Sequence, residues 1–458
     1  MADRRLRVVL SMPRTLAMDD STPPLSLLML AAVAEEECDI RIIFPIDVEA
    51  AIAGLPHSLA GIDVFGLSVN SFSWYAARRM IAAVRQHHPR IKIVIGGPHP
   101  THHDRYCLAT TQADAVVRGE GEVTFPELLR AWASGEEPER VAGLSWKDGD
   151  GVVRVNPDRE LLTEAGLDAL PLPAYHLVPP ARYGFAPMET SRGCRFRCVF
   201  CAIPFPRGIR QFGLARVEKL LERIESLRDR FTMNSVFLSD DSFSAHRERV
   251  EGTLQLFRAI VPDWRIGCEA RISELLQHDL LPHFGRNNVY LLQVGVECGY
   301  DEGLKRIRKG LTRAMVRDFA LLAAKLPFHY SVYWSFIIGL PWETEYEVLQ
   351  TINFAFNTAR ASGSQQPQVN PFSPYPGSAI AGHPEEYDLA PIEPSLYDDS
   401  SWFSRFIGYS KVRDENRAFL GHYLQAMHTA YPNYVQSPVV HFPAGPMMEN
   451  PALQWTSP

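Results

Sequence analysis

The first third of the chain alternates short apolar runs with stretches in which apolar residues recur at helical spacing. Apolar runs that end in turn residues predict buried strands, and helical spacing predicts amphipathic helices. We expect strands at 7–12, 38–45, 63–69, 91–95 and 114–117, and helices at 25–36, 75–87 and 125–132. Strands that alternate with helices predict a doubly wound parallel sheet, so the fold class is α/β.

Polar or glycine-bearing residues follow three of the expected strands. They are Asn70 and Ser71 after 63–69, then Gly96, Gly97, Pro98 and His99 after 91–95, and finally Arg118, Gly119, Glu120 and Gly121 after 114–117. Ligands of doubly wound sheets bind outside the carboxyl ends of the strands, where glycine lets the backbone approach a large ligand closely. The sequence therefore predicts a Rossmann-like domain at 1–135 with a ligand site at this edge.

Residues 136–180 are less regular. Apolar runs flank Asp148-Gly149-Asp150-Gly151 within 142–155, which predicts a hairpin. Prolines at 171, 173, 179 and 180 indicate a stiff, extended connector. We therefore expect a linker with a hairpin at 136–180 and a domain boundary there.

A second series of strands and helices follows the linker. Strands are expected near 188 and at 235–238, 264–269, 290–296, 330–338 and 368–370, with helices at 217–229, 247–259, 272–284, 301–309, 313–326 and 346–361. This order predicts a partial (β/α)6 barrel at 181–378, whose active groups would come from the carboxyl ends of its strands. Residues 379–458 form a C-terminal region with one expected helix at 415–430.

Composition limits the classes of function. Hydrophobic residues make up 46% of the chain, enough for two cores, and the net charge of −7 gives no reason to expect nucleic-acid binding. No apolar run reaches the roughly 18 residues of a membrane span, and the N-terminus has no secretory signal. Free cysteines without such a signal favour the reducing cytoplasm.

Three of the seven cysteines stand together as Cys194, Cys198 and Cys201. A disulfide framework would need an even number of cysteines in a small secreted domain, and a zinc site would need a fourth ligand nearby. A cubane iron–sulfur cluster bound by three thiolates would keep one iron open for a substrate. The spacing therefore favours a [4Fe–4S] cluster, with a structural metal clip or buried thiols as the alternative.

This C-x3-C-x2-C motif, with Phe200 before the last cysteine, resembles the signature of the radical S-adenosylmethionine superfamily. The resemblance implies that the amino acid part of S-adenosylmethionine chelates the open iron. An electron from the cluster then yields a 5′-deoxyadenosyl radical that abstracts hydrogen from the substrate.

Further strand-end segments are similar to the same family. Gly295-Val296-Glu297-Cys298-Gly299 resembles Gly-Val-Glu-Ser-Gly, and Gly339-Leu340-Pro341-Trp342-Glu343-Thr344 resembles Gly-Leu-Pro-Gly-Glu-Thr. Cys298 and Trp342 depart from these patterns. The resemblance implies an S-adenosylmethionine site made by Phe200, Asp240, Asp241, Arg271, Glu297 and Gly339. A turn cap by the two aspartates and a surface ion pair of Arg271 are the structural alternatives.

The order of the N-terminal segments resembles the cobalamin-binding domain of B12-dependent radical S-adenosylmethionine enzymes. The resemblance implies that cobalamin contacts residues at or just after the ends of the three strands, namely Ser68, Val69, Asn70, Gly96, Gly97, Pro98, His99, Arg118, Gly119, Glu120 and Gly121. The chain has no D-x-H-x-x-G motif, so we expect base-off cobalamin without a histidine ligand, and we do not expect His99 to bind cobalt. A domain that has lost cobalamin is the alternative.

The resemblance implies a methyltransferase that moves a methyl group from methylcobalamin to an unactivated carbon after hydrogen abstraction. A cyclase or ring-rearranging enzyme, or a radical enzyme with a cobalamin domain that serves only as a scaffold, would share the architecture. The expected partners are a small metabolite or peptide substrate and an electron donor such as flavodoxin or ferredoxin, with neither nucleic acid nor membrane. The C-terminal region is expected to cover the substrate.

Overall fold

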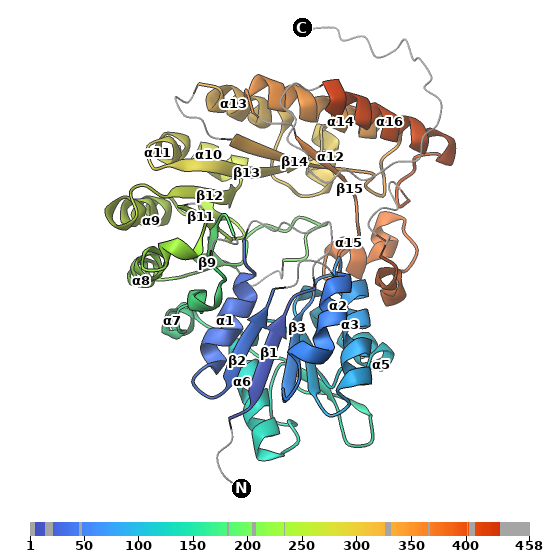
Figure 1. Cartoon of the computed structure of the whole chain (residues 1–458). Coiled ribbons are helices and arrows are strands. Elements are labelled where there is room, and N and C mark those ends of the chain that lie inside the picture. Colours follow the sequence, from blue (N-terminus) through green and yellow to red (C-terminus); the bar gives the residue numbers. More distant parts are fainter. Residues whose placement is uncertain are drawn as a thin grey trace.

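The computed structural model describes residues 5–13, 22–44, 48–180, 183–203, 208–232, 234–325, 331–364, 367–400, 402 and 408–430. A domain drawn in blue and cyan lies below a larger domain drawn in green to orange (Figure 1). Each domain is built on a sheet with helices packed against it. Within the described ranges, no helix is both long and apolar enough to cross a bilayer.

The first sheet has seven strands in the order β2-β1-β3-β4-β5-β6-β7. The strands are β1 (Arg7–Ser11), β2 (Asp39–Ile43), β3 (Val64–Ser68), β4 (Lys92–Gly96), β5 (Ala115–Val117), β6 (Leu144–Lys147) and β7 (Val153–Val155). Its helices are α1 (Leu25–Ala34), α2 (Val48–Ser58), α3 (Trp74–His87), α4 (Pro98–His102), α5 (Asp104–Thr110) and α6 (Gly121–Ser134). The strands β1 to β5 are parallel, which confirms the doubly wound sheet predicted from the sequence.

Three features of this domain differ from the sequence prediction. The hairpin expected in the linker is β6 and β7, and β6 pairs antiparallel with β5, so the first sheet continues past 135 to Val155. The helix α2 was not predicted, since it carries an internal proline and a single buried residue, Leu55. The short helices α4 and α5 were not predicted either, because they follow Gly97 with too few turns to show a period.

The helix α1 is apolar around almost its whole circumference because it is covered on two sides. Leu27 packs into the core between the first sheet and α6, whereas Leu28 belongs to the core of the second domain. The backbone carbonyl of Leu28 also accepts a hydrogen bond from Ala174 of the connector. The helix therefore connects the two domains. Because both of its sides are buried, it has no polar face.

The second sheet has six parallel strands in the order β15-β14-β13-β12-β11-β8, open at both edges, as the predicted partial barrel requires. The strands are β8 (Ala186–Met188), β11 (Ser235–Leu238), β12 (Arg265–Ala270), β13 (Val289–Glu297), β14 (Ser331–Ile338) and β15 (Gln368–Pro371). A separate pair, β9 (Ser191–Arg192) and β10 (Arg210–Gln211), flanks the cysteine loop.

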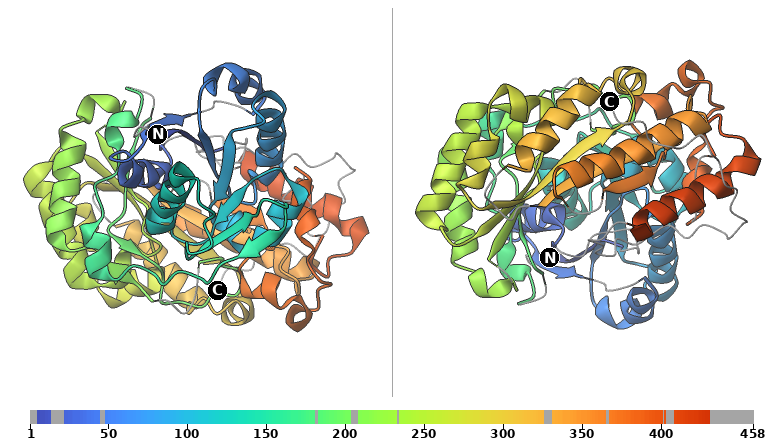
Figure 2. Two further views of the ribbon diagram at one scale, coloured as in Figure 1. Left: turned by 90° about the horizontal axis from the view of Figure 1, so that it is seen from below. Right: turned by 90° about the horizontal axis from the view of Figure 1, so that it is seen from above.

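Helices cover the outer side of this sheet (Figure 2). They are α8 (Leu214–Glu225), α9 (Arg247–Ile260), α10 (Ile272–Gln277), α11 (Leu281–Gly285), α12 (Asp301–Arg306), α13 (Arg313–Ala323) and α14 (Glu345–Ala361), with α7 (Glu164–Ala169) in the connector. The single helix expected at 272–284 is two, because Asp279 adopts a left-handed φ of 49° between them.

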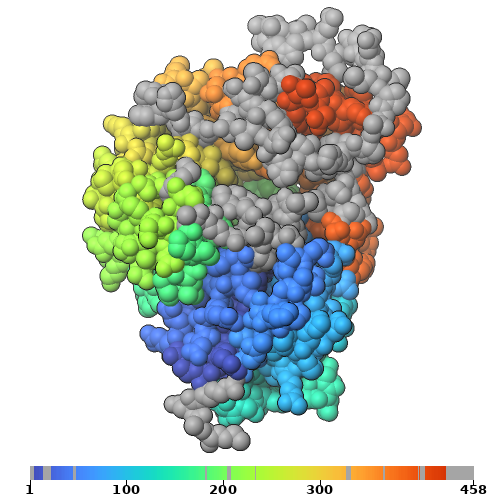
Figure 3. Space-filling model, viewed as in Figure 1, coloured from blue at the N-terminus to red at the C-terminus, as the bar shows by residue number. Residues whose placement is uncertain are grey.

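The described part of the C-terminal region holds α15 (Ala379–Gly382), two short 3-10 helices, η4 (Pro384–Tyr387) and η5 (Pro394–Asp398), and α16 (Asp414–Ala430). Tyr397 and Trp402 join the core cluster of the first domain, beside α3. In Figure 3, orange residues of this region lie against light-blue residues of the first domain. The helix α16 packs on α14, away from the sheet. The remainder of the expected substrate cover, 431–458, lies outside the described residues.

Candidate functional site

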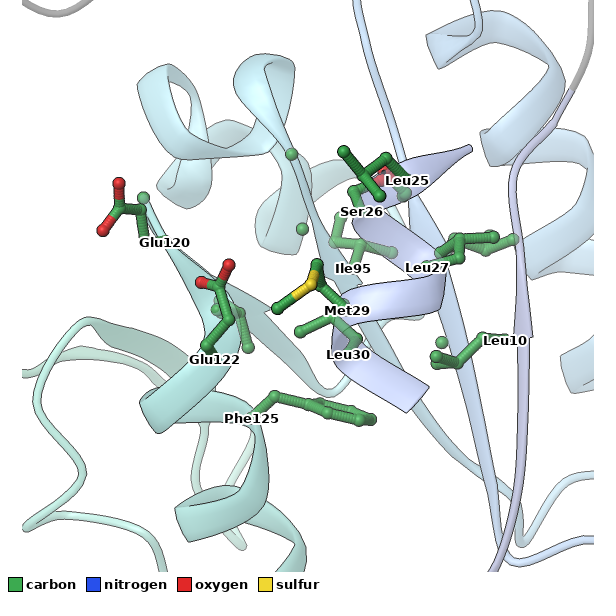
Figure 4. A pocket seen from close by; sticks show the side chains of 18 of the residues that line it. Leu10, Leu25, Ser26, Leu27, Met29, Leu30, Ile95, Glu120, Glu122 and Phe125 are labelled. Carbon is green, nitrogen blue, oxygen red and sulfur yellow. Dashed lines mark hydrogen bonds between the residues drawn. The ribbon is translucent and has the colours of Figure 1, made fainter. Parts of the chain in front are cut away.

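A mostly apolar cavity of about 360 Å³ opens at the carboxyl edge of the first sheet (Figure 4). The ends of β1, β3, β4 and β5 form one wall, and α1 and α6 form the other. Leu10, Leu27, Met29, Ile95 and Phe125 give the apolar part of its lining. This volume is in the range of small-molecule sites in proteins.

Two glycines let the backbone pass close to this cavity. Gly97 has a left-handed φ of 100°, and a Cβ there would stand 2.6 Å from the carbonyl oxygen of Val69. Gly119 has a left-handed φ of 71° and faces open space, since a Cβ at this position would meet no heavy atom within 4 Å. These backbone conformations favour glycine, as the sequence pattern predicted.

The predicted cobalamin-binding residues divide into two groups. The cavity is lined by Ser68, Gly96, Gly97, Gly119, Glu120 and Gly121. The other predicted residues, Val69, Asn70, Pro98, His99 and Arg118, lie outside its lining. Two of them have structural partners, since Asn70 accepts a hydrogen bond from the Ser73 amide at 2.9 Å and Arg118 pairs with Asp158 at 2.9 Å.

His99 is fully buried in an apolar cluster rather than directed at the cavity. Its ring stacks on Trp74 at 4.8 Å, meets the edge of Tyr397 at 5.3 Å, and its Nδ1 lies 3.1 Å from the Ser71 hydroxyl. Burial and the neighbouring His103 lower the pKa of His99 to about 3. The expectation that His99 does not bind cobalt stays a prediction.

The three cysteines of the motif lie in the loop between β9 and β10. All three are half-buried free thiols. Cys198 Sγ is 3.7 Å from the Arg271 guanidinium and 3.8 Å from the carbonyl oxygen of Arg308. A nearby guanidinium stabilises negatively charged thiolates. Among the described residues, no three His, Cys, Asp or Glu side chains gather tightly enough to hold a single metal ion.

The two aspartates predicted to contact S-adenosylmethionine instead hold the start of the cysteine loop. The buried Asp240 carboxylate accepts hydrogen bonds from the amide and hydroxyl of Thr190, both at 2.5 Å, and from those of Ser191. Asp241 accepts the Gly193 amide at 2.7 Å. With four donors already bound, the Asp240 carboxylate has no free lone-pair position for a ligand. Its partners stand before the cysteine loop and not in the turn that follows the aspartates, so it is not the turn cap considered as the structural alternative either.

Three of the other predicted S-adenosylmethionine residues, Phe200, Arg271 and Glu297, converge on Lys309. Its ammonium group lies 2.8 Å from the Glu297 carboxylate and 5.8 Å from the centre of the Phe200 ring. Arg271 donates to the backbone carbonyl of Lys309 and stacks on Phe196. Lys309 and Glu297 are both buried, with 6% and 7% of their surface exposed. The structure thus joins Arg271, Glu297 and Phe200 through a lysine that the sequence did not single out.

Gly339 occupies the turn between β14 and α14, with a left-handed φ of 80°. The fully buried Glu343 accepts hydrogen bonds from the amides of Gly339 and Leu340, at 2.7 and 3.1 Å, and from the Tyr300 hydroxyl at 3.0 Å. Burial raises the pKa of Glu343 to about 7. Trp342, which replaces the family's glycine, donates its indole N–H to the same Tyr300 hydroxyl at 3.0 Å.

Glu269, near the end of β12, is a carboxyl that the sequence analysis did not assign to a site. Within the described part of the chain it has no recorded hydrogen bond or ion pair. Its side chain is exposed to solvent near the end of the strand. The surrounding protein, together with the negative charges of Asp241 and Glu297, raises its pKa to about 7. A carboxyl near neutrality at a barrel strand end can exchange a proton or accept a hydrogen bond from a ligand.

An ion-pair network links the cavity to the cysteine loop. Arg192 contacts Glu122 and Glu189, each at 2.6 Å, and Arg210 reaches Glu120 at 3.0 Å. These acids line the cavity together with Arg192. Because β9 and β10 carry the two arginines on either side of the loop, the ion pairs join the cavity lining to the two strands that flank the thiols.

Sequence reasoning missed Lys309, Arg192, Arg210 and Glu343 as members of the site. Arg192 stands two positions before Cys194, which is a signal of proximity to the loop, but its acidic partner Glu122 belongs to the other domain. The partner of Lys309 is close in sequence, but Glu297 follows a register irregularity in the pairing of β13 with β14 that no local pattern indicates. Such pairings depend on tertiary structure and have no local pattern.

Comparisons with known proteins agree with this geometry. A model of the B12 binding domain matches residues 16–129, and a model of the radical SAM superfamily matches residues 188–355. The chain is 30% identical over 368 residues to the uncharacterized methyltransferase PH0819 of Pyrococcus horikoshii, covering 78% of this chain and 77% of that protein. It is 24% identical to the anaerobic magnesium-protoporphyrin IX monomethyl ester cyclase of Rubrivivax gelatinosus, covering 69% of this chain and 58% of that one.

A solved structure shares the fold. It is the radical S-adenosylmethionine methyltransferase TsrM from Kitasatospora setae, with cobalamin and a [4Fe–4S] cluster bound. The superposition gives a TM-score of 0.66 at 16% identity and covers 87% of this chain and 82% of TsrM. At this identity the likeness concerns the arrangement of the two domains.

Proposed function

Since the chain belongs to the cobalamin-binding radical S-adenosylmethionine enzymes, we propose that it methylates an unactivated carbon of a small metabolite or peptide. The observation that carries the proposal is the lining of the cavity. It contains residues of the cobalamin domain and also Glu189, Arg192 and Ser239 of the radical domain. A methyl donor held in the first domain would therefore stand beside the loop that holds the radical source.

The residues present fit the three cofactors of the family. Three free thiols in one loop, with the guanidinium of Arg271 beside Cys198, suit a [4Fe–4S] cluster. The cavity between β4, α1 and α6 presents the apolar wall and close backbone that a large corrinoid would need. When bound, the cluster and S-adenosylmethionine supply a carbon radical, and cobalamin supplies the methyl group.

The chain's own part is to position and shield these groups. We propose that Phe200, Arg271, Glu297 and Gly339, together with Lys309, form the S-adenosylmethionine site. Asp240 and Asp241 would hold the cysteine loop in register with β11. Fixing reacting groups at close range supplies a large part of the rate enhancement in such reactions.

The test is transfer of label from the S-adenosylmethionine methyl group. The protein, reconstituted under anaerobic conditions, would be incubated with a panel of small molecules and peptides that the neighbouring genes suggest. A methyltransferase yields 5′-deoxyadenosine and a product that carries the label. An active protein whose product never carries the label would contradict the proposal.

A second function has a specific observation in its favour, the similarity to the magnesium-protoporphyrin ester cyclase of Rubrivivax gelatinosus. A cyclase or ring-rearranging enzyme would also form 5′-deoxyadenosine and need cobalamin, but its product would lack the labelled methyl group. Turnover without bound corrinoid would instead support a cobalamin domain that serves only as a scaffold.

A further inference from the structure

Two basic segments of the chain contain no acidic residue. One of them includes the cysteine loop, and the other contacts it. No Asp or Glu occurs from 190 to 217 or from 303 to 317, although the chain has 53 acidic and 46 basic residues. The two segments touch, since the Val199 amide donates to the carbonyl oxygen of Ile307 at 3.2 Å and Cys198 Sγ lies 3.8 Å from that of Arg308. The fold thus concentrates positive charge at one place in an acidic protein.

Part of this charge is buried and serves the site. Arg192 and Arg210 pair with acids of the first domain, Arg271 contacts Cys198, and Lys309 pairs with Glu297. Five other exposed cations stand close in sequence to the contacts at Cys198 and Val199. They are Arg195, Arg197, Lys305, Arg306 and Arg308, and we call them the basic collar.

The collar is only partly neutralised by neighbouring groups. Arg195 reaches the buried Glu274 carboxylate at 2.9 Å and keeps 40% of its side chain exposed, and Arg306 stacks over Trp342 at 4.4 Å. The C-terminal region brings Glu386 near Arg306 and Arg308, beside Tyr387. For Lys305, Arg306 and Arg308, no ion pair is recorded within the described ranges. Exposed cations therefore stand on both of the segments that meet at Cys198.

We propose that the basic collar is the docking surface for an acidic protein that delivers single electrons to the cluster. The inference rests on the proposed function, because the radical reaction consumes one electron each time S-adenosylmethionine is cleaved reductively. The donor loses one electron, and the [4Fe–4S] cluster gains it, passing from the 2+ to the 1+ state. Cations around a redox centre raise the rate of encounter with an acidic carrier, an effect that salt screens.

A nucleic acid is a weaker explanation of the collar. Phosphate recognition usually uses a long row of cations on a basic domain, and the whole chain carries a net charge of −7. The collar instead consists of five cations on the two segments that meet at Cys198, one of the three cysteines of the cluster motif.

The test compares two reductants on the reconstituted protein that holds its cluster. One is the hydroquinone of a flavodoxin, an acidic flavin protein, and the other is dithionite, a small reductant that needs no docking surface. The variant is Arg197→Glu with Lys305→Glu, and the control is Arg90→Glu with Arg140→Glu, which changes the net charge equally on the exposed surface of the first domain. Bleaching of the cluster absorbance gives the rate, and titration calorimetry gives the affinity for oxidised flavodoxin.

We expect the collar variant to lose about tenfold or more in the rate with flavodoxin at low salt and to bind it more weakly. Its rate with dithionite and its dithionite-driven formation of 5′-deoxyadenosine should match the wild type, and the control variant should be unaffected. If the wild type forms no 5′-deoxyadenosine with dithionite, the result contradicts the proposed function and not the docking surface.

Equal rates with flavodoxin for the collar variant and the wild type would overturn the proposal and leave the collar as a charge offset for the cluster. Salt-dependent binding of an RNA or DNA oligonucleotide to the collar, with no effect on flavodoxin, would also overturn it. Should the double variant lose iron, Lys305→Glu alone carries the test, since Lys305 lies outside the cysteine loop on α12 and touches none of the thiols.

Discussion

At the scale of single residues, the pair of Lys309 and Glu297 is the most constrained feature of the site. Glu297 adopts a left-handed φ of 77°, a conformation that costs a residue other than glycine about 1–3 kcal/mol. Its carboxylate is buried and compensated by the lysine ammonium at 2.8 Å. The surroundings therefore hold a strained, charged residue in place, which is typical of a position that binds a ligand.

Replacing Lys309 with Met should destabilise the fold by about 3–5 kcal/mol, because it leaves the Glu297 charge buried without a partner. Urea unfolding monitored by circular dichroism measures the change, and Lys309→Arg should retain most of the stability. The double variant with Glu297→Gln should recover stability relative to Lys309→Met alone. If the double variant were no more stable than the single one, the pair would not be coupled as described.

Asp240 carries a second prediction at this scale. Asp240→Asn removes one acceptor oxygen from a group that now accepts four hydrogen bonds from Thr190 and Ser191, and it adds a donor facing these donors. We expect a loss of about 1–3 kcal/mol in stability and a lower iron content after reconstitution. Asp241→Asn, at the more exposed neighbour, should have a smaller effect on stability. Equal effects would argue against a special role of Asp240.

At the scale of elements, the sequence predicted the bounds of the strands better than it predicted which strands pair with one another. The apolar runs of β1, β3 and β11 are local signals, and the structure places them within a residue or two of the predicted bounds. The pairing of β6 with β5 has no local signal, so the hairpin was assigned to a linker. The cysteine motif could be found in the sequence because it is a local pattern. The ion pair of Arg192 across the domain boundary could not, because it depends on tertiary structure.

The turn between β14 and α14 gives a pH prediction. The pKa of Glu343 is raised to about 7 in the folded protein, whereas an unfolded glutamate has a pKa near 4.5. A raised carboxyl pKa adds stability below pH 4.5, and this contribution is lost as the pH rises through about 7. The wild type should therefore lose up to about 3 kcal/mol between pH 5 and pH 8 that Glu343→Gln does not lose. Parallel pH profiles of unfolding for the two proteins would contradict this.

At the scale of the whole molecule, the C-terminal region ties the two domains together. Asp398, at the end of η5, accepts hydrogen bonds from Trp74 at 2.8 Å and Tyr106 at 2.5 Å and pairs with Arg78 at 3.0 Å, all in the first domain. The segment η5 follows the barrel in sequence but contacts the first domain. These contacts therefore form a second connection between the two domains, in addition to α1. Sequence reasoning expected this region only as a cover for the substrate.

Replacing Asp398 with Ala should loosen the packing of η5 on the first domain while leaving both domains folded. Hydrogen exchange should become faster in 394–400 and in α3, since the buried indole of Trp74 and the Tyr106 hydroxyl lose their acceptor. Exchange in β11 and β12 should be unchanged and serves as an internal control. Unchanged exchange throughout would show that the aromatic contacts of Tyr397 hold the segment without the aspartate.

The central claim is that one chain holds an iron–sulfur cluster and a corrinoid at two sites linked by ion pairs. Iron, sulfide and corrinoid bound per chain, measured after anaerobic reconstitution of the wild type and of Cys198→Ala, test it most directly. We predict about four irons and one corrinoid for the wild type. Cys198→Ala should lose the iron and keep the corrinoid, because the cavity lies mainly in the first domain. Wild-type protein that binds no iron and sulfide, or no corrinoid, would contradict the account.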